Sequence, residues 1–217
     1  MAANETPIKI QVFSDYICPW CYVGLARVDK LREEYNVEID YQAFFLRPDI
    51  GPAGAPRKAR PGEQEVEPGT IMTSPVGQLG AEAGLVMKRS ALTPYTRLAL
   101  EATEYAKSKG KVEEMHHALF KSYWGDGVNL GELPVLLDVA DKAGLDADDL
   151  KKHIEAHTYQ QVITEQYEFA QEVGITGIPA FIIGQYLFMG AHPYSFFQQV
   201  MERVMREREE ENQILLK

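Results

Sequence analysis

The 217-residue sequence predicts an α/β protein in which a block of helices separates two strand-containing ends. Alternating apolar patterns typical of strands occur near both ends of the chain, whereas the middle has the spacing of amphipathic helices. The only two cysteines lie between the first predicted strand and the first predicted helix. These observations place the expected chemistry where the first strand meets the first helix.

The N-terminal segment predicts a β-α-β unit. Ile8–Phe13 alternates apolar and polar residues and then becomes apolar, which is typical of a strand entering a sheet. A helix is expected over Tyr22–Glu34 and a second strand over Val37–Phe45. The second strand places four side chains on one face, as a period of two requires: Val37, Ile39, Tyr41 and Ala43.

A long connection, residues 47–77, follows this unit. It holds six of the twelve prolines of the chain: Pro48, Pro52, Pro56, Pro61, Pro68 and Pro75. Glycines recur through the same stretch, which disfavours regular structure. Connections of this length are usually functional or mobile. We interpret it as a linker, with a lid over an active site as the alternative.

Residues 78–173 predict a helical insertion domain built from several short helices joined by brief turns. Thr93-Pro94 is expected to open one of these helices, because proline suits the first helical turn. Asp146 and Thr158 are expected to cap the helices that follow them.

The C-terminal segment returns to strands. Ala180–Ile183 and Tyr186–Met189 predict a hairpin, and Pro193 is expected to open a final helix. The order is therefore β-α-β, a helical block, and α-β-β-α. With a Cys-x-x-Cys at the first helix, this order predicts a thioredoxin fold with a large helical insertion. Residues 1–46 and 174–217 would form the thioredoxin-like domain.

The two cysteines form the motif Cys18-Pro19-Trp20-Cys21. A helix N-terminus presents unpaired N–H groups and a partial positive charge, which stabilise the thiolate form that attacks disulfides. Two intervening residues let Cys21 reach back to Cys18 and resolve a mixed disulfide. We therefore predict dithiol–disulfide chemistry, with both cysteines catalytic and Pro19 and Trp20 beside the substrate.

Two less specific interpretations compete with this one. A structural disulfide is disfavoured by the expected reducing compartment. Half of a zinc site is the other alternative, because His153 and His157 have a ligand-like spacing. They lie more than a hundred residues from Cys21, among charged residues, and we interpret them as surface histidines without a metal.

Ile178-Pro179 precedes the first strand of the predicted hairpin. In a thioredoxin-like fold an X-Pro bond at this place is cis and faces the cysteine pair. The backbone groups of Ile178 would then be free to pair with an extended substrate, as an added strand does. We expect Ile178 and Pro179 to bind substrate, and Pro179 to keep a metal-binding side chain away from the thiols.

The chain resembles the DsbA family of thioredoxin-fold oxidoreductases, and within it the cytoplasmic FrnE-type branch. The matching segments are Ser14–Gly24, Thr96–Ala102, Asn129–Gly131, Gly174–Phe181, Gly190-Ala191 and Pro193-Tyr194. The resemblance implies a protein disulfide oxidoreductase with Cys18 as nucleophile, Cys21 as resolving thiol and Pro179 as the cis-proline. It also implies that the helical insertion lies over the active site. Relatives keep a buried acid six residues before the first cysteine, where this chain has Val12.

Composition narrows the partners and the compartment. The formal net charge of −10 argues against a nucleic-acid surface, and no apolar run approaches the length of a membrane span. Met1–Thr6 lacks the basic start and apolar core of a secretory signal, so we expect a cytoplasmic protein. The expected partners are protein or small-molecule thiols and disulfides, with glutathione or a thioredoxin system supplying electrons. No bound cofactor is expected beyond the cysteine pair itself.

Two other functions stay open. One is a glutathione-dependent isomerase or transferase resembling 2-hydroxychromene-2-carboxylate isomerases and kappa-class glutathione transferases, in which a serine stands at the position of Cys18. The other is a chaperone or assembly partner that uses aromatic residues near the motif, such as Tyr16, Trp20 and Tyr22.

Overall fold

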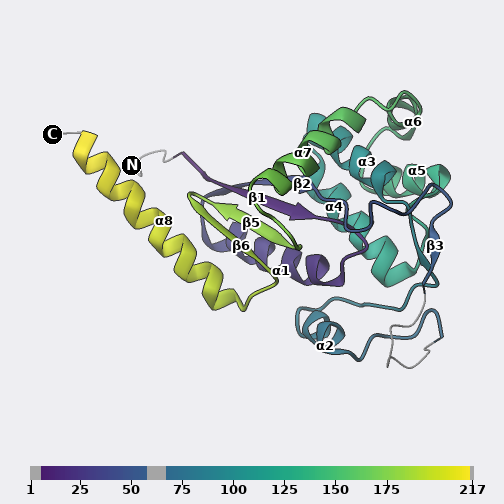
Figure 1. Cartoon of the computed structure of the whole chain (residues 1–217), viewed down its shortest axis with the longest axis horizontal. Helices are drawn as coiled ribbons and strands as arrows, with labels where there is room; N and C mark the ends of the chain where they lie inside the picture. The colour runs from purple at the N-terminus through teal and green to yellow at the C-terminus, as the bar shows by residue number, and fades with distance from the viewer. Residues whose placement is uncertain (1–5, 58–66, 216–217) are drawn as a thin grey trace.

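The computed structural model describes residues 6–57 and 67–215 (Figure 1). Residues 58–66 of the proline-rich connection lie outside the described residues, as do residues 216–217. Residues 1–5 also lie outside the described residues. They make up most of the segment Met1–Thr6, on which the expectation of a cytoplasmic protein depends. Within the described part, no helix is both long enough and apolar enough to cross a membrane.

A four-stranded mixed sheet joins the two ends of the chain, as the sequence predicts (Figure 1). The central strand β1 (Ile8–Ser14) runs parallel to β2 (Val37–Ala43) on one side. On its other side it pairs antiparallel with β5 (Ala180–Ile183), which forms a hairpin with β6 (Tyr186–Met189). The spatial order is β2-β1-β5-β6.

Helices cover both faces of the sheet. Successive strand residues point to opposite faces, and β1 carries apolar side chains on both of them. Val12 belongs to the large core beneath α1 (Pro19–Glu34), together with Phe197 of α8 (Tyr194–Leu215). Its neighbour Phe13 points the other way, into a smaller core against α7 (Gln160–Glu172). Helix α1 thus lies within the thioredoxin-like core, and its first turn follows the loop after β1.

The helical insertion lies between β2 and β5 in the sequence and beside the sheet in space (Figure 1). Its segments are α3 (Arg97–Ser108), α4 (Val112–Lys121), the π-helix η1 (Ser122–Asp126), α5 (Leu133–Lys142), α6 (Ala147–Glu155) and α7. The predicted fold class is therefore confirmed: an α/β thioredoxin fold with a helical insertion between the sheet strands.

Helix starts were predicted with mixed success. Asp146 caps α6, as expected, because its carboxylate accepts a hydrogen bond from the Asp149 N–H at 2.9 Å. The prediction for Thr158 is wrong: the residue before α7 is Tyr159, and no side chain caps it. The helix expected from Thr93-Pro94 begins later, because Thr93 pairs in a short ladder with Ala55.

The proline-rich connection is more ordered than a simple linker in its described parts. It contributes β3 (Ala55–Pro56), which pairs with β4 (Leu92–Thr93), and it leads into α2 (Pro75–Glu82). Gly77 is required in α2, since a Cβ there would lie 2.1 Å from the Met72 carbonyl oxygen. Close backbone packing thus fixes the turn before α2, and α2 in turn contacts α1.

Candidate active site

The two cysteines lie in the first turn of α1, immediately after the loop that follows β1. Cys18 is the N-cap residue, with extended backbone angles, and Pro19 occupies the first helical position. The Cys21 N–H donates to the Cys18 carbonyl at 3.1 Å, so the helical turn itself brings the two residues together. Both are free thiols, with 3% of Cys18 and 2% of Cys21 exposed. The sequence correctly places the motif at a helix start.

The environment of Cys21 favours its protonated form. Burial raises the pKa of the Cys21 thiol well above its usual value, and the adjacent Cys18 raises it further. A hydrogen bond from the backbone of Asp15 opposes these effects. The thiol that would resolve a mixed disulfide is therefore held neutral inside the protein.

Ile178 and Pro179 face the cysteines from the other end of the chain. Their peptide bond is cis, which confirms the prediction. The Cys18 thiol donates to the Ile178 carbonyl oxygen at 3.5 Å, and the Gly190 N–H binds the Pro179 carbonyl at 2.7 Å. A Cβ on Gly24 of α1 would lie 3.1 Å from Pro179 Cγ, so a glycine there lets the loop approach the helix closely.

Access to the site is narrow. Pro179 is buried, whereas Pro19 and Ile178 are partly exposed. Trp20 is 40% exposed, the most accessible side chain of the motif. Trp20 is therefore the side chain of the motif that is most open to a partner.

The insertion holds the loop before the cysteines in place. Trp124 of η1 donates its indole N–H to the Tyr16 carbonyl at 2.9 Å. Tyr22 of α1 stacks on Phe120 of α4, with ring centroids 5.3 Å apart and nearly parallel planes. Single-turn π-helices often occur at functional sites, and this one contacts the loop before the motif from 108 residues away in the sequence.

Asp15, three residues before Cys18, is a site residue that the sequence analysis missed. It is 1% exposed, and its carboxylate accepts hydrogen bonds from the N–H of Ile17 at 3.3 Å and of Leu46 at 2.9 Å. Burial raises the pKa of Asp15 to about 6, although these hydrogen bonds and one from Thr96 oppose the rise. An acid directly after a buried strand was the available signal.

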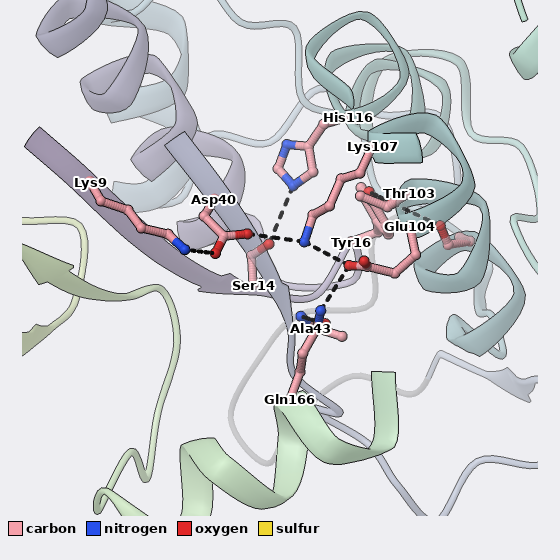
Figure 2. Close-up of polar contacts among 11 residues, drawn as sticks. Lys9, Ser14, Tyr16, Asp40, Ala43, Thr103, Glu104, Lys107, His116 and Gln166 are labelled. Atoms are coloured by element: carbon pink, nitrogen blue, oxygen red, sulfur yellow. Dashed lines mark hydrogen bonds and ion pairs between the residues drawn. The ribbon is translucent and has the colours of Figure 1, made fainter. Parts of the chain in front are cut away.

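A polar layer joins the sheet to the insertion at a separate place (Figure 2). Its contacts run from Lys9 through Asp40, Lys107 and Glu104 to Gln166, which also accepts from the Ala43 N–H. Nearby, Ser14 Oγ lies 3.4 Å from His116 Nε2, and burial lowers the pKa of His116 well below its usual value. Lys9, Asp40, Lys107 and Glu104 compensate one another's charges, whereas the buried Nδ1 of His116 has no hydrogen-bond partner among the described residues.

The structure shows no metal-binding cluster, in its described part, for the alternative of a zinc site. Among residues 6–57 and 67–215, no three His, Cys, Asp or Glu side chains are grouped so that they could hold a metal ion. His153 packs near Tyr105 and Tyr159 and lies 3.2 Å from the Thr158 hydroxyl, while His157 pairs with Glu101 at 3.4 Å.

Comparison with known proteins agrees with this geometry. The model of the DSBA-like thioredoxin domain matches residues 9–202. YwbO, a protein of Bacillus subtilis, is 30% identical over 199 residues, which cover 89% of this chain and 96% of YwbO. A 2-hydroxychromene-2-carboxylate isomerase of Pseudomonas putida is 21% identical over 91% of this chain and 96% of its own length.

A similar solved structure shares the fold as well. The crystal structure of a probable DsbA oxidoreductase from Streptomyces coelicolor superposes with a TM-score of 0.76 at 24% identity, covering 92% of this chain and 91% of that one. The match of the family model over nearly the whole chain, with the Cys-x-x-Cys pair at the start of α1, shows that the chain belongs to the DSBA-like thioredoxin domain family.

Proposed function

We propose that the protein is a thiol–disulfide oxidoreductase in which Cys18 is the nucleophile and Cys21 the resolving thiol. One observation carries the proposal: Cys18 occupies the N-cap position of α1 and contacts the Ile178 carbonyl, while Cys21 lies buried and protonated one turn later. This arrangement provides one thiol at a helix N-terminus, where a thiolate is stabilised, and a second that waits as a thiol.

The reaction balances without a cofactor. The Cys18 thiolate attacks one sulfur of a substrate disulfide, the substrate S–S bond breaks, and the leaving sulfur takes a proton. The Cys21 thiol then loses its proton and attacks the Cys18 sulfur of the mixed disulfide, which releases the second substrate thiol. The substrate gains two electrons and two protons, and Cys18 and Cys21 become a disulfide. The reverse sequence oxidises a dithiol substrate.

Substrate recognition depends on the backbone beside Pro179. Ile178 lies on the segment that enters β5, so an extended substrate could pair with it as an added strand. The exposed face of Trp20 would support the residues on either side of the substrate sulfur. Protein or small-molecule disulfides fit this mode, and glutathione or a thioredoxin system would return the cysteines to the reduced form.

The finer assignment to the FrnE-type branch and to the cytoplasm forms part of the same proposal. The branch assignment rests on the sequence of the motif region, and the compartment is proposed with it. In a reducing compartment the resting state would be the dithiol, and the protein would act as a reductase.

The test is the equilibrium redox state of the cysteine pair across glutathione buffers, read by alkylation of free thiols and mass determination. We expect a reversible two-electron transition between dithiol and intramolecular disulfide. Cys18→Ser and Cys21→Ser serve as matched controls, and neither should show it. Absence of an intramolecular disulfide over the whole range would refute the proposal.

Glutathione-dependent isomerisation is the second candidate, favoured by the similarity to the Pseudomonas putida isomerase over nearly the whole chain. It predicts that Cys18→Ser retains glutathione-dependent turnover of a 2-hydroxychromene-2-carboxylate. Loss of all activity in that variant, with dithiol exchange present in the original protein, would decide for the oxidoreductase.

A further inference from the structure

The resolving step poses a problem of charge inside the protein. Cys21 must become a thiolate to attack the mixed disulfide, yet it is 2% exposed and burial disfavours its ionised form. Whatever controls the charge around this sulfur therefore controls how fast the mixed disulfide resolves.

Asp15 is the carboxyl group at this place. Its carbonyl accepts a hydrogen bond from the Cys18 N–H at 3.0 Å, so the residue directly contacts the start of the cysteine pair. Its side chain is held by backbone N–H groups that originate 2 and 31 residues away. No Lys, Arg or His among the described residues forms an ion pair with it.

A carboxyl with these surroundings exists in two charge states near neutral pH. Burial, with no counter-ion among the described residues, raises the pKa of Asp15 to about 6. The pKa of Cys21 is raised mainly by burial and by Cys18, and the charged form of Asp15 adds to this rise. The other ionisable groups facing Asp15 are Tyr16 and Tyr123 of η1, whose pKa values are raised by burial, so both stay neutral in this range. Arg97, next to Thr96, lies over the Phe45 ring instead.

We propose that Asp15 is a positioning residue of the redox site whose buried charge restrains the ionisation of Cys21 and so slows the resolution of mixed disulfides. This inference rests on the proposed function. At a given pH, a molecule with ionised Asp15 should hold a mixed disulfide longer than a molecule with neutral Asp15.

The test separates attack from resolution with the aromatic disulfide dithiobis(nitrobenzoate). Attack by Cys18 releases the first coloured thiolate in a second-order phase, and attack by Cys21 releases the second in a first-order phase. The first-order rate constant is measured from about pH 5 to about pH 8 for the original protein, Asp15→Asn, Cys21→Ser and Asp49→Asn. Asp49 is an exposed carboxylate paired with Arg47, and it provides the same chemical change where water screens the charge.

In the original protein, the logarithm of the first-order rate constant should rise with pH and flatten near pH 6, as the charge on Asp15 appears. Asp15→Asn should lose this bend and resolve faster at neutral pH. The gain is about three- to fourfold for each unit by which the pKa of Cys21 falls, since lower basicity partly offsets the larger thiolate fraction. Asp49→Asn should follow the original protein.

Other results overturn the inference in distinguishable ways. A rate profile without a bend in the original protein refutes it even if Asp15→Asn does not fold. Resolution that is unchanged in Asp15→Asn assigns the residue a purely structural role, and slower resolution would make its carboxylate a proton acceptor instead. Cys21→Ser cannot show the second phase, because it lacks the resolving thiol. If the original protein also lacks this phase, the proposed function itself fails.

Discussion

Asp15 directly follows β1 and Asp40 lies on the neighbouring strand β2; Asp15 is fully buried and Asp40 partly buried, and their surroundings differ. Asp40, on β2, lies 2.9 Å from the Lys9 ammonium and 3.2 Å from that of Lys107. Burial acts to raise the pKa of Asp40, but Lys107 and Lys9 outweigh it and hold the pKa below its usual value. Asp15 has backbone and hydroxyl donors but no cationic partner in the described part of the chain, and its pKa is raised to about 6.

The comparison separates a charge that stabilises the fold from one that is available to chemistry. The paired cluster around Asp40 links β1, β2, α3 and α7 through compensated charges (Figure 2). Removing one partner would leave the charge of the other without compensation in a partly buried place, which destabilises the fold. The carboxyl of Asp15 changes charge within the working range of pH, and it does so beside the thiols.

The largest expected effect comes from the nucleophile. Cys18→Ser should lower the rate of disulfide exchange about a thousandfold or more, since a buried hydroxyl does not ionise near neutral pH. Cys21→Ser should still attack the substrate but stop at the mixed disulfide, visible by mass. The rate is measured with dithiobis(nitrobenzoate), with Asp40→Asn as the control that keeps both thiols. Exchange that persists in Cys18→Ser would move the chemistry away from this end of α1.

Asp15 should give the next largest effect, in the pH dependence of stability. Its folded pKa of about 6 lies above the unfolded value, so its contribution is full below about pH 4 and is lost as pH rises through about 6. The loss amounts to about 3 kcal/mol between those limits. The free energy of unfolding is measured in urea for Asp15→Asn and for the original protein. As pH rises, the value for Asp15→Asn should increase relative to that of the original protein.

A parallel course of the two stability curves between about pH 4 and about pH 7 would show that Asp15 ionises as in the unfolded chain. Asp15→Asn also removes one acceptor from the N–H groups of Ile17 and Leu46, so the variant should be less stable at acid pH. The slope with pH, and not the offset, is the informative quantity.

Asp40 should show the opposite sign. Its folded pKa is lowered, so its stabilisation is present above the unfolded pKa of about 4 and is lost as pH falls through the folded pKa. Asp40→Asn should lower the free energy of unfolding by about 1–2 kcal/mol at neutral pH, and this deficit should shrink on acidification. Resolution of mixed disulfides should not change. If the stability deficit of Asp40→Asn grew in acid, or if its resolution rate changed, Asp40 would not differ from Asp15 in the way described.

The sequence was informative where a role depends on neighbouring residues. The cysteine motif at a helix start, the cis bond at Ile178-Pro179 and the hairpin of β5 and β6 are each encoded within about a dozen residues, and the structure contains all three. A search for a buried acid by position found Val12, which lies in the core under α1.

The role of Asp15 could not be predicted in the same way. Its burial and its raised pKa depend on Leu46, 31 residues later, and on Thr96 at the start of α3. The late start of α3 has a similar cause, since Thr93 is recruited into a ladder with Ala55 of the proline-rich connection. Tertiary partners decided both outcomes, and a local pattern does not contain them.

The smallest expected effect tests the contact between α1 and the cis-proline loop. In Gly24→Ala the new methyl group would lie 3.1 Å from Pro179 Cγ, so the loop must move by a few tenths of an ångström. We expect a loss of about 1 kcal/mol in the free energy of unfolding and a slower first phase with dithiobis(nitrobenzoate), because the Ile178 carbonyl shifts against Cys18. Gly177→Ala is the matched control, since a Cβ there meets no atom within 4 Å. Equal rates in the two variants would mean that attack by Cys18 does not depend on how closely this loop packs against α1.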